Sequence, residues 1–296
     1  MIEIKNLYHS LGTKSVLENV NITVKESTIT GLVGINGAGK TTLLRLISGI
    51  YTPDKGTIFY KGYPVDRPDV KEKIFFLPDD PFYNHSTTGA ELFKMYKSLY
   101  PSADHAVFMK NVELFGIDVK ARVRTFSKGM RRQALTILAL ASKPDYIFFD
   151  ETFDGLDPVM RNYIKKLICQ DVVDRGATAI ITSHSLRELE DTCDQLALLH
   201  KGGIILESDV QNLKTSQYKV QIAFSEDFDK SLFESIEIVS FVKHGSVANL
   251  IVKGEREETV AKLQALNPVL LDVLPLTLEE VFTYEMEALG YSFNLD

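Results

Sequence analysis

The sequence has only two cysteines, no tryptophan, no excess of basic residues and no apolar run long enough to cross a bilayer. Cys169 and Cys193 match no metal or disulfide spacing, and the six histidines are scattered, so neither a metal finger nor a disulfide scaffold is expected. The most apolar stretch, Ala134–Ala141, is about ten residues short of a membrane span. The first five residues lack a signal-peptide pattern. With a net charge of −7, no nucleic acid partner is expected.

A glycine-rich segment fits the phosphate-loop pattern G-x-x-x-x-G-K-[ST]. It consists of Gly34, Ile35, Asn36, Gly37, Ala38, Gly39, Lys40, Thr41 and Thr42. The apolar run Ile29–Val33 predicts a buried strand before this segment, and Thr41–Ser48 predicts a helix after it. Loop N–H groups and a helix N-terminus together favour bound phosphates. The segment therefore predicts a nucleoside triphosphate site in which Lys40 reaches the β- and γ-phosphates and the Thr41 hydroxyl binds Mg²⁺.

Strand patterns alternate with helical patterns over residues 1–214, which predicts an α/β domain. Further strands are expected at Thr57–Tyr60, Lys73–Leu77, Tyr146–Phe149, Ala177–Thr182 and Gln195–Leu199. Between about residues 87 and 142 only helical patterns occur, so we expect an inserted helical subdomain with helices at Ala90–Leu99, Ala106–Phe115 and Lys128–Ala141.

In the last part of the chain, residues 215–296, three strand patterns are followed by helical patterns, which predicts a small C-terminal α+β domain. Its expected strands and helices are Tyr218–Phe224, Ile236–Phe241, Ala248–Val252, Glu255–Leu266 and Leu278–Glu287. A chain of 296 residues has room for one large and one small domain.

A second functional element is the apolar strand Tyr146–Phe149, which ends in the carboxylates Asp150 and Glu151. A phosphate-loop enzyme needs a carboxylate that holds Mg²⁺ through its water shell, and Asp150 has the position for this role. Glu151 is a candidate to polarise the attacking water. The alternative is a strand that merely ends in a solvated acidic turn, and the presence of Lys40 in the same chain argues against it.

Four segments, in this order along the chain, resemble the nucleotide-binding subunit of ATP-binding-cassette (ABC) transporters over residues 1–214. After the phosphate loop, Phe126–Met130 resembles the L-S-G-G-Q signature of the family. Asp150–Pro158 resembles its catalytic acids and the loop that crosses its dimer, and Thr182-Ser183-His184 matches its switch histidine. The resemblance implies a P-loop NTPase core of ABC type, with ATP and Mg²⁺ as cofactors and ATP hydrolysis coupled to transport.

The resemblance also implies a mechanism. Two ATP-binding subunits, identical or different, pair head to tail, so that Ser127 and the backbone of Gly129 face the γ-phosphate held by the other subunit. Glu151 acts as base or water-orienter, and His184 bridges it to the γ-phosphate. Loss of the γ-phosphate loosens the dimer, and a separate transmembrane permease subunit converts this two-state switch into transport. The chain is therefore expected in the cytoplasm, peripheral on the inner face of the cell membrane through that partner.

Several positions depart from the family pattern. Leu11 stands where the family has an adenine-stacking aromatic, and Tyr8 either touches the base instead or faces the core. Asp79 replaces the coupling glutamine; since an aspartate accepts a hydrogen bond from Mg²⁺-bound water, we expect it at the metal site with Thr41 and Asp150. Met130 replaces the signature glutamine.

Two surface features leave alternatives open. Pro81-Phe82-Tyr83 either lines a groove for a partner helix or packs in the core. Lys128, Arg131 and Arg132 predict a solvated helix face, with direct phosphate contact considered for Lys128 only.

By analogy, the signature variant, the segment around Asp79 and the stretch Leu278–Met286 resemble bacterial efflux systems, including drug and antimicrobial-peptide exporters. The alternative function is a non-transport ABC ATPase of the translation or DNA-repair type. Members of the first type have two cassettes on one chain and members of the second have a long coiled coil, and the sequence shows neither.

Overall fold

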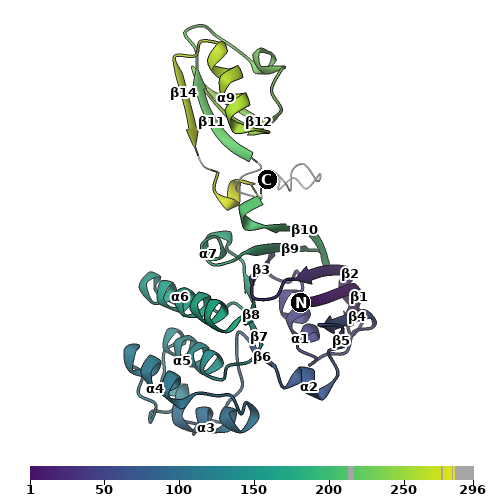
Figure 1. Ribbon diagram of the computed structural model, residues 1–296, viewed down its shortest axis with the longest axis vertical. Helices are drawn as coiled ribbons and strands as arrows, with labels where there is room; N and C mark the ends of the chain where they lie inside the picture. Colours follow the sequence, from purple (N-terminus) through teal and green to yellow (C-terminus); the bar gives the residue numbers. More distant parts are fainter. Residues whose placement is uncertain (213–216, 275, 282, 284–296) are drawn as a thin grey trace. The chain divides into compact units, whose positions relative to one another are not determined.

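The computed structural model describes residues 1–212, 217–274, 276–281 and 283. Contacts divide the chain into two compact units, Met1–Glu207 and Ser208–Asp296. In the described part of the chain, the first unit has two sheets and the second has one, and each unit has its own core (Figure 1).

The first unit is built on a six-stranded sheet with the order β10-β9-β3-β8-β7-β6. Its strands are β3 (Ile29–Val33), β6 (Ile74–Leu77), β7 (Tyr146–Phe149), β8 (Thr178–Ser183), β9 (Gln195–His200) and β10 (Gly203–Asp209). Strands β6, β7, β8, β3 and β9 pair in parallel, and every residue of β3, β7 and β8 is buried. Burial on both faces explains why these strands are continuous apolar runs in the sequence. Because parallel strands point the same way, the segments that follow β3, β7 and β8 meet at one edge of the sheet.

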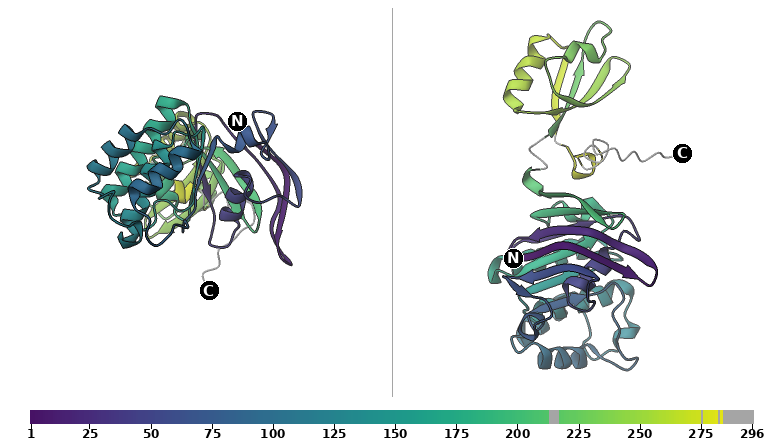
Figure 2. Two further views of the ribbon diagram at one scale, coloured as in Figure 1. Left: turned by 90° about the horizontal axis from the view of Figure 1, so that it is seen from below. Right: turned by 90° about the vertical axis from the view of Figure 1, so that its right-hand side faces the viewer.

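A second, antiparallel sheet has the order β2-β1-β4-β5. It consists of β1 (Ile2–Leu11), β2 (Lys14–Val24), β4 (Lys55–Tyr60) and β5 (Tyr63–Pro64). Helix α1 (Lys40–Ile47) contributes Leu43, Leu44, Leu46 and Ile47 to a core that also takes residues from both sheets. The helix is therefore packed between the two sheets (Figure 2), which fixes the position of the loop from which it emerges.

Between β6 and β7 the chain forms a group of helices at one side of the six-stranded sheet (Figure 1). After the short helix α2 (Pro68–Lys71), which precedes β6, these are α3 (Gly89–Leu99), α4 (His105–Leu114), the 3-10 helix η1 (Val123–Thr125) and α5 (Lys128–Ala141). Each long helix begins at a residue whose side chain accepts from backbone N–H groups: Thr88, Asp104 and Ser127. The rings of Phe93 and Phe108 stack at 4.6 Å and join α3 to α4.

Three described α-helices of the first unit were not predicted: the single turns α2 and α7 (Leu186–Leu189) and the long helix α6 (Pro158–Arg175). Helix α6 begins at Asp157, which accepts from two backbone N–H groups, has Pro158 as its first residue and ends at Gly176 in a left-handed conformation (φ 67°). These are standard start and stop signals of a helix, so the sequence contained the information that defines it.

The second unit is an α+β fold with a four-stranded antiparallel sheet of order β12-β13-β11-β14. Its elements are β11 (Gln217–Ala223), the 3-10 helix η2 (Lys230–Phe233), β12 (Ile238–His244), β13 (Val247–Lys253), α9 (Arg256–Ala265) and β14 (Leu270–Leu274). Val220, Leu250 and Leu263 lie in its core, where α9 covers one face of the sheet. No ranges were predicted for strands β1, β2, β5, β10 and β14. Of the helix expected at Leu278–Glu287, residues 278–281 and 283 are helical, and the remainder lies outside the described residues.

Candidate nucleotide site

The loop of residues 34–39 connects β3 to α1 at the carboxyl edge of the parallel strands. A side chain at Gly34 would place its Cβ 2.4 Å from the carbonyl oxygen of Leu199, so only glycine fits there. Gly37 and Gly39 have φ angles of 81° and 110°, a region that L side chains rarely adopt. The glycine spacing of the motif is therefore required by the course of the backbone itself.

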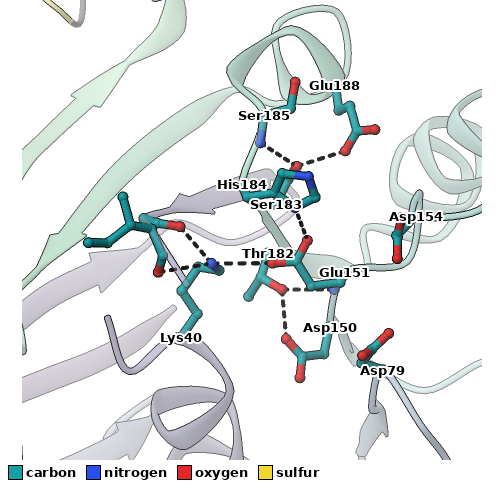
Figure 3. Close-up of polar contacts among 12 residues, drawn as sticks. Lys40, Asp79, Asp150, Glu151, Asp154, Thr182, Ser183, His184, Ser185 and Glu188 are labelled. Atoms are coloured by element: carbon teal, nitrogen blue, oxygen red, sulfur yellow. Dashed lines mark hydrogen bonds and ion pairs between the residues drawn. The ribbon is translucent and has the colours of Figure 1, made fainter. Parts of the chain in front are cut away.

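Lys40 is the first residue of α1, and its side chain is only 6% exposed. Its Nζ donates to the carbonyl oxygen of Gly34 at 2.6 Å and lies 3.2 Å from Oε1 of Glu151 (Figure 3). A buried ammonium inside a loop of backbone amides, at the start of a helix, is an arrangement that suits the phosphates of a nucleotide.

Asp150, which follows β7, is almost fully buried and is held by two hydroxyl groups. Thr41 Oγ1 donates to Asp150 Oδ2 at 2.7 Å, and Thr182 Oγ1 donates to Asp150 Oδ1 at 2.8 Å. The backbone N–H of Glu151 donates in turn to Thr182 Oγ1 at 2.9 Å. The structure thus brings together Thr41 and Asp150, the hydroxyl and the carboxylate that the sequence suggested for Mg²⁺, and hard oxygen ligands of this kind fit that ion.

Glu151 and His184 continue this chain of contacts (Figure 3). Nδ1 of His184 lies 3.0 Å from Oε2 of Glu151, while the other carboxylate oxygen faces Lys40. The Glu151 side chain is 17% exposed, whereas that of His184 is 54% exposed. Glu151 also has a φ of 49°, an unusual backbone conformation for a non-glycine residue, of a type found at functional sites. The three residues predicted to be catalytic therefore lie in contact.

Ser127 and Gly129 lie at the start of α5. Ser127 Oγ accepts from the backbone N–H of Met130 at 3.2 Å, and a Cβ at Gly129 would come within 3.0 Å of the Gly155 carbonyl oxygen. In the part of the chain that the structure describes, no hydrogen bond joins either residue to Lys40, Asp150 or Glu151. The action of these two residues on the nucleotide of a second subunit stays a prediction.

Asp79 has a partner that was not expected. Its carboxylate forms an ion pair with the guanidinium of Arg132 on α5, and its side chain is 55% exposed. The Arg132 side chain is 4% exposed, and its Nη1 lies 3.4 Å from the Pro78 carbonyl oxygen and 3.5 Å from that of Asp150. In this structure Asp79 is therefore bound by Arg132 and is not joined by a hydrogen bond to the pair formed by Thr41 and Asp150.

The prediction of a solvated cationic face on α5 is wrong for Arg132, whose pKa is lowered by desolvation on burial. Arg131 Nη1 donates to the Tyr83 hydroxyl at 3.0 Å, and Lys128 Nζ pairs with Asp154 Oδ2 at 2.5 Å. The hydrogen bond from Lys128 holds the pKa of the Asp154 carboxyl below its ordinary value. Helix α5 lies against two loops of the core, so its cations meet acceptors that are distant in sequence.

Three aromatic or aliphatic positions discussed above are exposed. The Phe82 residue is 93% exposed, so its packing in the core is excluded. Tyr8 and Leu11, both on β1, are 38% and 46% exposed, and a core position for Tyr8 is likewise not observed.

The chain was compared with known proteins. The family model described as ABC transporter matches residues 17–154. YtrB of Bacillus subtilis (strain 168), an ABC transporter ATP-binding protein, is 32% identical over 95% of this chain and 97% of its own length. The Nod factor export ATP-binding protein I of Burkholderia lata is 28% identical over 95% of each chain. A solved structure of an ATP binding subunit of an ABC transporter is 25% identical, with a TM-score of 0.66 over 72% of this chain and 92% of that one.

The fold and the site define a phosphate-loop ATPase of the cassette type. The chain belongs to the ABC transporter ATP-binding proteins and is the ATP-hydrolysing subunit of a transporter. Subunits of this family dimerise and act with separate transmembrane components. The predicted fold class and function are confirmed. Among the described helices, none has the length and apolar character that a membrane span requires.

Proposed function

We propose that this chain powers an export-type transporter by hydrolysing ATP with Mg²⁺ in a head-to-tail dimer. The observation that supports the proposal most directly is the continuous set of contacts from Thr41 through Asp150 and Thr182 to Glu151, and from Glu151 to both Lys40 and His184. It supports the proposal because Lys40, Thr41, Asp150 and Glu151 lie beside one loop, where they would serve as a phosphate-binding cation, two metal-binding oxygen donors and a general base.

Each residue has a role that its surroundings support. Backbone N–H groups of residues 34–42 and the Lys40 ammonium bind the phosphates. Thr41 and Asp150 hold Mg²⁺, with Asp79 a further oxygen donor once it leaves Arg132; when bound, this ion neutralises charge on the phosphate oxygens. Glu151 orients the attacking water and accepts its proton. His184 fixes the Glu151 carboxylate.

The second subunit completes the site. The N-terminus of α5 has the helix-dipole polarity that attracts a phosphate, and Ser127 and Gly129 lie in its first turn. We assign these two residues to the γ-phosphate bound by the other subunit, whether that subunit is a second copy or a different chain. ATP then favours the closed dimer, and its hydrolysis releases the two halves.

A transmembrane permease is the proposed partner, and its binding would place this chain at the inner face of the cell membrane. Export is favoured by the similarity to the Nod factor export ATP-binding protein I of Burkholderia lata, which extends over both units of this chain.

Purification of the tagged chain from membranes in mild detergent tests the assignment. We expect a multi-span membrane protein in stoichiometric amount, and an ATPase activity that requires Mg²⁺ and is lost in Lys40→Ala. A variant with Lys166→Ala, at an exposed position of α6, serves as a matched control for loss of a lysine. Recovery of ribosomes or of a DNA-repair complex in place of the membrane protein would contradict a transport function.

A further inference from the structure

Side chains of helix α5 bind the loop of residues 78–83 at both of its ends. Near one end, Arg132 pairs with Asp79 and lies 3.4 Å from the Pro78 carbonyl oxygen. At the other end, Arg131 Nη1 donates to the Tyr83 hydroxyl at 3.0 Å. Two consecutive side chains of one helix therefore hold both ends of the same loop.

Between these two contacts the loop is loosely attached. Residues 79–83 form no backbone–backbone hydrogen bond with any described residue, and Pro78 and Pro81 have no N–H to donate. A hollow of about 220 Å³ lies between the loop and α5. Phe82, in the middle of the loop, is 93% exposed. Among the described residues, the hydrogen bonds that join this loop to α5 therefore come from the two arginines.

The same arginines are rigidly connected to the signature. The backbone N–H of Arg131 donates to the Ser127 carbonyl oxygen at 3.0 Å, in the first turn of α5. The Ser127 side chain caps that turn through Met130. A shift of Arg131 or Arg132 with the loop therefore moves Ser127 as part of one helical turn. Arg132 also reaches the carbonyl oxygen of Asp150, next to Glu151.

We propose that Arg131 and Arg132 are positioning residues that transmit the position of the 78–83 loop to the signature serine. This inference rests on the proposed function, because it assumes that Ser127 acts on the nucleotide of a second subunit. The arginines do not contact the bound nucleotide in this scheme. They set the angle at which α5 presents Ser127 and Gly129, and they hold that helix against the strand end that bears Glu151.

Tyr83→Phe is the sharpest variant, because it deletes one hydroxyl, leaves the ring and removes only the contact with Arg131. Tyr100→Phe is its matched control. The Tyr100 hydroxyl donates to the Ile74 carbonyl oxygen at 2.7 Å and so also joins the helical subdomain to the core, but through α3 and away from the 78–83 loop. Arg132→Lys keeps the charge beside Asp79 but loses the planar fork that reaches Pro78 and Asp150.

All variants are made in a Glu151→Gln background, and two quantities are measured. Binding of a fluorescent ADP analogue to the monomer reports the phosphate loop, and the ATP concentration that gives half-maximal dimerisation, followed by light scattering, reports the signature. Tyr83→Phe and Arg132→Lys should raise that ATP concentration about two- to tenfold, since one hydrogen bond is lost or weakened. ADP binding should not change, and Tyr100→Phe should alter neither quantity.

A double variant strengthens the test. If Tyr83 and Arg131 act through their mutual contact, Arg131→Gln combined with Tyr83→Phe should resemble Arg131→Gln alone. The inference is overturned if Tyr83→Phe dimerises at the ATP concentration of its background, or if it weakens ADP binding as much as dimerisation. Failure of the Glu151→Gln background itself to dimerise with ATP would overturn the proposed function, and with it this inference.

Discussion

The phosphate loop and the signature helix are two halves of one function, but they are built differently. The phosphate loop is held by its own backbone, by its glycines and by Lys40, all within nine consecutive residues. The start of α5 is held by side chains, each of which reaches a partner 26 to 53 residues away: Asp154, Tyr83 and Asp79.

This difference suits a rigid phosphate loop, here called the rigid side of the site, and an adjustable signature helix, here called the adjustable side. Lys40 and Asp150 are buried, and each is held by hydrogen bonds. Lys128 and Asp154 are both more than 40% exposed, so their ion pair is screened and costs little to break. Asp79 is 55% exposed, whereas its partner Arg132 is 4% exposed, so opening that pair leaves a buried guanidinium without its carboxylate partner. In the proposed mechanism, ATP is therefore bound by a preformed loop and control acts through the signature helix.

The largest expected effect lies on the rigid side. Glu151→Gln removes the base while its size and its contact with His184 are largely kept, so turnover should fall by about 100-fold or more. ATP binding should persist, and ATP should trap the dimer. Steady-state ATPase assays and gel filtration with ATP measure both effects. Hydrolysis at the parent rate, or no shift towards dimer, would remove Glu151 from its role.

The same contrast explains how far the sequence alone could lead. The phosphate loop, the carboxylates after β7 and the buried parallel strands follow from local patterns, because each element is determined by residues that are neighbours in sequence. The ion pair of Asp79 with Arg132 could not be predicted, since it depends on how α5 packs against a loop 53 residues away. Exposed edge strands such as β14, with only partly buried alternation, also escaped prediction.

The substitution Leu11→Tyr tests whether the rigid side lacks an aromatic residue that stacks on the base of the nucleotide. Leu11 is exposed on the hairpin where the family places an aromatic, so ATP and GTP should be hydrolysed at comparable rates. Leu11→Tyr should tighten ATP binding about two- to tenfold through aromatic stacking. Side-by-side kinetics with both nucleotides measure this. A strong preference of the parent for ATP that Tyr8→Ala abolishes would show that Tyr8 already supplies the stack.

Asp79 is expected near the Mg²⁺ of the rigid side and pairs with Arg132 on the signature helix. Its variants therefore affect both the rigid side and the adjustable side. Asp79→Asn keeps the size of the side chain but removes the charge that pairs with the buried Arg132, and turnover should fall about two- to fivefold, because the amide oxygen can still accept a hydrogen bond from the guanidinium. Asp79→Gln restores the family residue and should preserve Mg²⁺-dependent turnover. Both variants should reduce stimulation by the membrane partner more than basal activity. Rates with and without the partner measure this, and equal losses in both conditions would assign Asp79 to the metal alone.

The smallest effect is expected for the pair of Lys128 and Asp154 on the adjustable side. The hydrogen bond from Lys128 lowers the Asp154 pKa in the folded state, so the pair stabilises the fold above the ordinary aspartate pKa, and this contribution is lost as the pH falls through the folded value. Asp154→Asn should therefore lower the free energy of unfolding at pH 7 by about 0–1 kcal/mol, and the difference should shrink below about pH 4. Urea unfolding across this pH range measures it.

Lys128→Met separates charge from packing, because the carbons of Lys128 lie over Gly155 and methionine keeps most of that contact. If charge is responsible, Lys128→Met and Asp154→Asn should have similar effects at pH 7 and the double variant should add little. A difference that stays constant with pH would mean that packing over Gly155, and not the ion pair, holds the loop to α5. The contact between Lys128 and the loop that bears Asp154 would then count as packing and no longer as an adjustable ion pair. Only Arg131 and Arg132 would remain as adjustable links between the signature helix and the rest of the unit.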